Sequence, residues 1–230
     1  MSERKNNIKV DLMQNEDKAV VLIVDDEPAL NELFVLGLKK YGFDTEGVLG
    51  GVQCLEKLRS GYRPDIILLD MIMDQMDGWE TLRNIKRNED TGDILVLMQT
   101  GKNLTHQEAR TYFSEIMGYI MKPITPKSSI GHIERSLYLH KSFREIRDAA
   151  VAAGLPADEV NDCIQTYRGL MVAKELAALL DSKYGAADDM HEAEEFSQCI
   201  KRLEKKYERL NAKLNLNLES VSQRIDTTAQ

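Results

Sequence analysis

The chain has few cysteines, no long apolar run and no excess of positive charge. Its three cysteines are an odd number spread over 230 residues, which argues against a disulfide framework. No apolar stretch approaches the roughly 20 residues of a membrane span. Residues 1–18 are polar and lack the apolar core of a signal peptide. We therefore expect a cytoplasmic protein that begins with a flexible leader at residues 1–18.

The charge balance weighs against a dominant role in binding nucleic acid. Residues 1–126 carry 15 basic and 21 acidic side chains, a net charge of −6, and residues 127–230 carry 15 and 17, a net charge of −2. Neither half is basic, which opposes a dominant role in binding nucleic acid. Hydrophobic residues make up 43% of the chain. That share is enough for a packed core and excludes wholesale disorder.

What the sequence does contain is a series of short apolar runs that each end in a polar side chain. These are 20–24 before Asp25 and Asp26, 66–69 before Asp70, 94–99 before Thr100, and 119–121 before Lys122. Segments of about 10–15 residues with helical spacing separate the runs, and residues 43–48 give a weaker strand signal. Strands that alternate with helices predict an α/β fold, a doubly wound five-stranded parallel sheet with helices on both faces.

The first of these helices illustrates how the pattern is interpreted. It should begin near Pro28, because proline is favoured in the first turn of a helix. The spacing of its apolar residues predicts a buried face made of Leu30, Leu33, Phe34, Gly37 and Leu38. The pair Tyr41–Gly42 should end it.

The polar residues that close the runs should meet, because the carboxyl ends of parallel strands lie at one edge of the sheet. A single aspartate at a strand end is often only a turn or cap residue, but three that meet repel one another unless a cation lies between them. Hard carboxylate oxygens suit Mg²⁺. A carboxylate such as Asp70 can carry a phosphoryl group. Thr100 and Lys122 would then offer a hydroxyl and a positive charge to its oxygens.

Four motifs in order give this arrangement a family resemblance. They are Val24-Asp25-Asp26-Glu27-Pro28, Leu69 to Gly78 (LDMIMDQMDG), Met98-Gln99-Thr100-Gly101, and Gly118 to Pro123 (GYIMKP). With these motifs at these separations, residues 19–126 resemble the receiver domain of two-component response regulators, the chemotaxis-regulator-like, flavodoxin-like fold. The resemblance covers a little under half of the chain.

The resemblance implies roles for the acidic residues. Asp70 would accept a phosphoryl group from the phosphohistidine of a histidine kinase or phosphotransfer protein. Asp26 and Asp70 would bind Mg²⁺ directly, Asp25 mainly through water, and the backbone carbonyl of Ile72 would complete the protein's share of the ligands. No other cofactor is implied. Such a domain is not an enzyme in the usual sense, since it catalyses only its own phosphoryl transfer and autodephosphorylation.

The resemblance also implies roles at the other strand ends. Thr100 and Lys122 would contact the phosphoryl group. Tyr119 matches the switch aromatic, whose rotation accompanies movement of Thr100, although a tyrosine on a strand is more often a packing residue. The bond between Lys122 and Pro123 matches a position that is often cis, and the sequence leaves its isomer open.

Two features depart from the family or vary within it. Asp74 stands where the family usually has proline, which adds a negative charge and predicts a looser loop. Ile72 and Lys102 occupy the two variable positions that tune loss of the phosphoryl group. An apolar Ile72 cannot orient an attacking water, so we expect a long-lived phosphorylated form.

Beyond Pro126 the strand pattern stops and only helical spacing remains. We expect a fifth helix and its extension at 127–153, then an all-helical output or interaction region at 154–230. From Phe196 to Leu214 apolar residues alternate at intervals of four and three. This spacing is typical of a seam in a helical hairpin or a coiled coil. The seam could form a homodimer through these helices or pack within the chain, and the sequence does not decide between the two.

The sequence gives a less specific indication of the output function of residues 127–230. A winged helix needs a terminal β-hairpin, which the sequence does not indicate, and a helix-turn-helix needs a basic recognition helix. The best basic cluster, Lys201 to Arg209, is interrupted by Glu204 and Glu208. We expect a response regulator that signals through protein interaction or dimerisation. A DNA-binding transcriptional regulator with an atypical helical output is the alternative.

Overall fold

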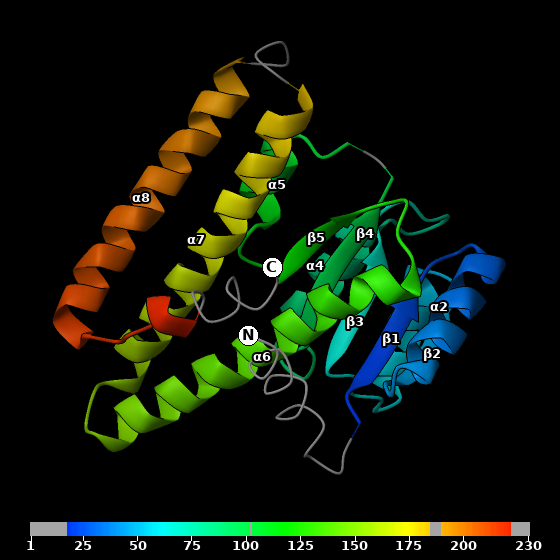
Figure 1. The fold of residues 1–230 in the computed structure, drawn as a ribbon, viewed down its shortest axis with the longest axis horizontal. Helices are drawn as coiled ribbons and strands as arrows, with labels where there is room; N and C mark the ends of the chain where they lie inside the picture. The colour runs from blue at the N-terminus through cyan, green and yellow to red at the C-terminus, as the bar shows by residue number, and fades with distance from the viewer. Residues whose placement is uncertain (1–17, 102, 185–189, 222–230) are drawn as a thin grey trace, which may run out of the picture. The chain divides into compact units, whose positions relative to one another are not determined.

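The computed structural model describes residues 18–101, 103–184 and 190–221 (Figure 1). The predicted leader at 1–18 lies outside these residues, except for Lys18. Contacts divide the described chain into two compact units, here called the sheet unit (18–101 and 118–137) and the helical unit (103–117, 138–184 and 190–221). Among these residues, none of the helices combines the length and apolar character needed to span a membrane.

The sheet unit is built on a parallel sheet. Within the described residues its strands, in spatial order, are β2 (Asp44–Val48), β1 (Val20–Val24), β3 (Ile66–Asp70), β4 (Leu95–Thr100) and β5 (Gly118–Met121). Every neighbouring pair is parallel. The predicted five-stranded parallel sheet, with flanking helices and a helical region after it, is therefore confirmed.

The order of the strands explains their sequence signals. The three central strands are buried along almost their whole length, which is why they read as continuous apolar runs. By contrast β2 lies at an edge, where Asp44 and Glu46 face solvent and only Thr45 is fully buried. This edge position accounts for its weaker strand signal.

The helices of the sheet unit are α2 (Pro28–Lys40), α3 (Gly51–Arg59), α4 (Gly78–Arg87) and the first part of α6 (Pro126–Ala152). As expected, α2 has proline in its first turn. Its predicted buried face is only partly correct: Phe34 and Leu38 are buried, Leu30 and Gly37 are half-buried, and Leu33 is 54% exposed. Asn31, which the apolar spacing did not include, is buried. Asn31 is a polar residue on the buried face, where its amide hydrogen bonds to the backbone carbonyls of Asp25 and Val48.

The helical unit contains α5 (His106–Tyr112), the later part of α6, α7 (Ala157–Tyr184) and α8 (Met190–Leu214). Figure 1 shows α7 and α8 side by side and antiparallel. Three ion pairs join them: Lys206 with Asp162, Lys213 with Glu159, and Lys174 with Glu204. The predicted seam on α8 buries Phe196, Tyr207 and Leu214, so its four-three spacing forms a hairpin within the chain.

Candidate functional site

Three carboxylates gather at the carboxyl edge of the sheet, as the sequence predicts. Val24, the last residue of β1, pairs with Leu69 of β3. The residues that follow each of them, Asp25 and Asp70, are therefore neighbours. One oxygen from each of Asp25, Asp26 and Asp70 lies within 4.8 Å of the other two. These are hard oxygen donors of the kind that Mg²⁺ prefers, so the residues present fit that ion.

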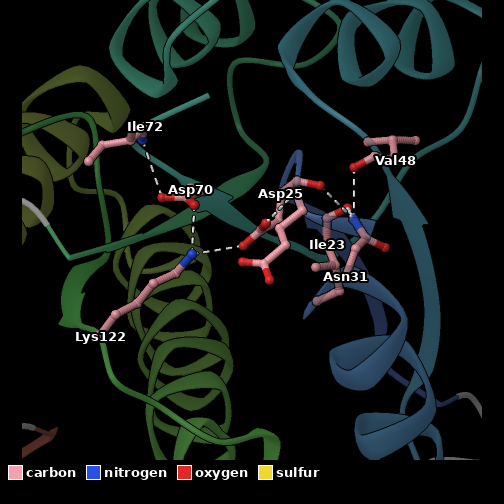
Figure 2. A network of polar contacts seen from close by, with 8 residues as sticks. Ile23, Asp25, Asn31, Val48, Asp70, Ile72 and Lys122 are labelled. Atoms are coloured by element: carbon pink, nitrogen blue, oxygen red, sulfur yellow. Dashed lines mark hydrogen bonds and ion pairs between the residues drawn. The ribbon is translucent and has the colours of Figure 1, made fainter. Parts of the chain in front are cut away.

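The ammonium of Lys122 lies among these carboxylates (Figure 2). Its Nζ donates to Asp70 Oδ2 at 2.6 Å and to Asp25 Oδ2 at 2.8 Å. The remaining oxygens of the two carboxylates accept from backbone N–H groups, Asp25 Oδ1 from Glu27 at 3.0 Å and Asp70 Oδ1 from Ile72 at 3.2 Å. Both carboxylates are thus fixed in orientation, and Lys122 balances part of their charge.

Burial makes the charges at this site costly. Asp70 is 8% exposed and Asp25 is 4% exposed. Burial raises the pKa of Asp70, and the charge of Asp25 adds to the rise, while the hydrogen bond and charge of Lys122 lower it. Burial also lowers the pKa of Lys122, but its hydrogen bonds to Asp25 and Asp70 outweigh that effect and the net shift is upward. Lys122 is therefore charged near neutral pH.

Asn31 is a site-building residue that the sequence analysis missed. Its amide Nδ2 donates to the carbonyl of Val48 at 2.8 Å and to that of Asp25 at 3.2 Å (Figure 2). It thereby joins the ends of β1 and β2 to α2 and holds the backbone that carries Asp25. Gly47 makes room for it, since a Cβ there would lie 1.9 Å from Asn31 Oδ1. The available signal was the position of Asn31, three residues before Phe34 and seven before Leu38.

The loop after β3 is held close to Asp70. A Cβ on Gly78 would lie 2.4 Å from the carbonyl oxygen of Asp70, so only glycine allows α4 to begin there. The N–H of Asp74 donates to Asp26 Oδ2 at 2.7 Å. Proline, which the family usually has at this position, could not make that bond because it lacks an N–H. The substitution that predicted a looser loop therefore provides a tie between the loop and Asp26.

The other predicted residues also lie at or near this edge. Thr100 ends β4 and is fully buried, and its carbonyl accepts from the N–H of Lys122 at 2.8 Å. Tyr119 lies in β5 beside Met98. Ile72 follows Asp70 closely and is 57% exposed. The peptide bond between Lys122 and Pro123 is cis, and Lys102 lies outside the described residues.

Known proteins match this same part of the chain. The family model described as "Response regulator receiver domain" matches residues 21–134. Residues 21–134 are a response regulator receiver domain. This region contains every residue of the acidic site and also α5. The resemblance that the sequence motifs indicate is thus confirmed, and the domain is one of two-component signalling.

Two curated relatives show how far the similarity extends. The chain is 33% identical over 117 residues to the DNA-binding response regulator MtrA of Mycolicibacterium smegmatis, a match that covers 51% of this chain and 50% of that protein. It is 29% identical over 136 residues to a probable cyclic di-GMP phosphodiesterase of Vibrio cholerae, covering 59% of this chain and 30% of that protein. The chain spans about half the length, or less, of these relatives.

A solved structure gives the same picture of the fold. A response regulator receiver domain protein (CheY-like) of Methanospirillum hungatei JF-1 is 22% identical and aligns with a TM-score of 0.50. The alignment covers 55% of this chain and 98% of that one. At this identity the similarity concerns the fold alone.

The raised pKa of Asp70 leads to a prediction about stability. A carboxyl that binds its proton more tightly in the folded state destabilises the fold once pH exceeds its raised pKa. Replacing Asp70 with Asn removes this buried charge while leaving Lys122 paired with Asp25. We expect Asp70→Asn to raise the free energy of unfolding at pH 7 without divalent ions. Urea unfolding measures it.

The pH dependence gives the control. The gain from Asp70→Asn should shrink as pH falls to the range where Asp70 is protonated in both the folded and unfolded states. Asp74→Asn, at an exposed position of the same loop, should change stability by less than about 0.5 kcal/mol. An Asp70→Asn protein that is less stable than the wild type at pH 7 would contradict the assignment of a costly buried charge.

Proposed function

We propose that Asp70 accepts a phosphoryl group from a phosphohistidine on a histidine kinase or phosphotransfer protein. The observation that carries this proposal is the position of Asp70 in a receiver domain, beside two further carboxylates and the ammonium of Lys122. Transfer forms a P–O bond to a carboxylate oxygen and breaks the P–N bond. The electron pair of that bond returns to the imidazole nitrogen.

Positioning and electrostatics supply most of what this transfer requires. Asp70 is held by Lys122 and by the N–H of Ile72, so its oxygens are oriented before the donor arrives. Lys122 would place its charge beside the transferred group, and the hydroxyl of Thr100 would donate to a phosphoryl oxygen. Tyr119, beside Met98 of β4, would be the switch aromatic that follows movement of Thr100.

The carboxylates would hold Mg²⁺ through Asp26 and Asp70 directly, with Asp25 acting mainly through water and the carbonyl of Ile72 as a further ligand. When bound, the ion supplies positive charge that offsets the charge on the phosphoryl oxygens. The tie from the N–H of Asp74 keeps Asp26 directed toward the site.

Asp70→Asn should abolish phosphoryl uptake. An amide cannot form the acyl phosphate, and the other residues of the site stay in place. The full chain would be incubated with acetyl phosphate and Mg²⁺, and intact mass would show the gain of one phosphoryl group. Asp74→Asn, which keeps the backbone N–H that Asp26 accepts, should retain uptake. Equal uptake by the wild type and Asp70→Asn would place the acceptor elsewhere.

The exposed side chain of Ile72 should determine how long the phosphoryl group lasts. It lies beside Asp70 and offers no group that could orient a water for attack. Ile72→Asn should shorten the lifetime of the phosphorylated form several-fold, whereas Ile72→Val should not change it. The decay would be followed after removal of the phosphodonor. Unchanged decay in Ile72→Asn would remove Ile72 from this role.

For the output, we favour protein interaction or dimerisation through the helical region. Within the basic stretch of α8, Lys206 pairs with Asp162 of α7, and Glu204 and Glu208 interrupt the positive charges, which supports protein interaction over a DNA-reading helix. MtrA is named as DNA-binding, but its match covers only 51% of this chain, and its output cannot be transferred. A transcriptional regulator with an atypical helical output is the second candidate.

Two measurements on the full chain separate these outputs. The mass in solution, with and without beryllofluoride and Mg²⁺, should change if the phosphorylated receiver controls self-association. Binding to mixed DNA fragments should be weak and only mildly dependent on salt. Nanomolar DNA binding with a steep salt slope would instead support the transcriptional regulator.

A further inference from the structure

One segment of the receiver domain packs in the helical unit. Residues 103–117 lie between β4 and β5 in sequence and within the family match at 21–134. They nevertheless form a compact unit with α7 and α8, and α5 contacts both helices. Figure 1 shows α5 beside α7. The receiver's own polypeptide therefore provides part of the core of the helical unit.

Specific contacts fix this packing. The guanidinium of Arg110 pairs with the carboxylate of Glu195 on α8. Arg168 of α7 donates through Nη2 to the carbonyl of Ser114 at 3.1 Å. A Cβ on Gly169 of α7 would lie 3.1 Å from Cε2 of Phe113. Charge, hydrogen bonding and close packing thus all act on residues 110–114.

Gly169 is informative because glycine is unfavourable in the interior of a helix. It lies in the middle of α7 and is buried. The ring of Phe113 occupies the space where its side chain would be. The surface of α7 is therefore shaped to receive the end of the α5 segment.

The α5 helix depends on this surface. It has seven residues, of which only Ala109 is buried, and helices this short are unstable by themselves. Its capping box, in which Thr105 and Glu108 bond to each other's backbone N–H, fixes only the first turn. The position of α5 is therefore set by what it packs against.

Both ends of the segment lead directly to the acidic site. It begins three residues after Thr100, and it ends at Met117, just before the strand that leads to Lys122. The N–H of Lys122 also donates to the carbonyl of Thr100. A shift of Thr100 or Lys122 toward a phosphoryl group would therefore pull on the polypeptide that α7 and α8 hold.

We propose that the α7–α8 hairpin restrains the receiver through α5. By holding α5, it favours the arrangement in which Lys122 is paired with the carboxylates of Asp25 and Asp70. Phosphorylation of Asp70 opposes that restraint and loosens α5 from the hairpin. This inference rests on the proposed phosphoryl-acceptor function of Asp70.

Thermodynamic linkage makes the restraint measurable from the acidic site. If the hairpin favours the unphosphorylated arrangement, then weakening its hold on α5 must raise the affinity of the site for a phosphoryl mimic. The same coupling requires that the mimic weaken the contact between α5 and the hairpin. Both directions can be tested on the full chain.

The affinity test uses two variants at the contact and two matched controls. Gly169→Leu puts a side chain against Phe113, and Arg110→Glu places like charges opposite Glu195. Each should bind beryllofluoride with Mg²⁺ about fivefold more tightly than the wild type. Gly131→Leu, on an exposed helical glycine with open space, and Lys213→Glu, which breaks an ion pair between α7 and α8 only, should leave the affinity unchanged.

The readout for binding is the fluorescence of Trp79, the single tryptophan of the chain, which is buried next to Gly78 at the loop of Asp70. Adding Glu195→Arg to Arg110→Glu restores the opposite charges and should return the affinity toward the wild-type value. If Gly169→Leu fails to fold, this exchange of charges carries the test alone.

Hydrogen exchange tests the reverse direction. Beryllofluoride should speed exchange of the amides in α5 and in α7 around Gly169. Wild-type affinity in the contact variants, or exchange that beryllofluoride leaves unchanged, would overturn the restraint while leaving the proposed phosphoryl acceptor standing. Failure of the wild type to bind beryllofluoride at all would instead remove the phosphoryl-acceptor function on which the inference rests.

Discussion

The ammonium of Lys122 between Asp25 and Asp70 is the interaction on which the rest of the site depends. Parallel strands bring their carboxyl ends to one edge, and here that edge collects three carboxylates within 4.8 Å. Removing the positive charge of Lys122, which bonds to two of them, would leave buried charges unpaired, typically at a cost of about 3–5 kcal/mol. The register of the parallel strands therefore brings the carboxylates together, and Lys122 offsets part of the repulsion between them.

The backbone around the acidic cluster is arranged to keep these charges where they are. Asn31 fastens the Asp25 loop to the end of β2, and Gly78 lets α4 begin against the carbonyl of Asp70. The N–H of Asp74 directs Asp26. Each device uses a group that carries no charge, so it orients the carboxylates without reducing the negative potential that attracts a metal ion. These contacts orient the carboxylates, while Lys122 offsets part of the charge of Asp25 and Asp70.

The sequence predicted the sheet well because central parallel strands are continuous apolar runs, and each run ended in a residue that now lies at the site. The prediction from sequence was less accurate for the edge strand β2 and for the buried face of α2. The edge strand β2 exposes Asp44 and Glu46, which hides its strand character. In α2, Leu33 is exposed and Asn31 is buried, because Asn31 hydrogen bonds to backbone carbonyls, which apolar periodicity does not take into account. The packing of α5 was not predictable, because the sequence of this seven-residue helix does not indicate which surface it packs against.

The placement of α5 bears on how the two halves of the chain can be separated. The contacts of Arg110 and Phe113 with α8 and α7 belong to the helical unit, while the polypeptide on either side of them runs into β4 and β5. A cut after Pro126 would therefore take α5 away from the hairpin, exposing the surface around Gly169. It would equally take the hairpin away from α5, leaving a short helix without its packing partner. The receiver and the helical region share this element, so the behaviour of either fragment alone does not describe the signalling chain.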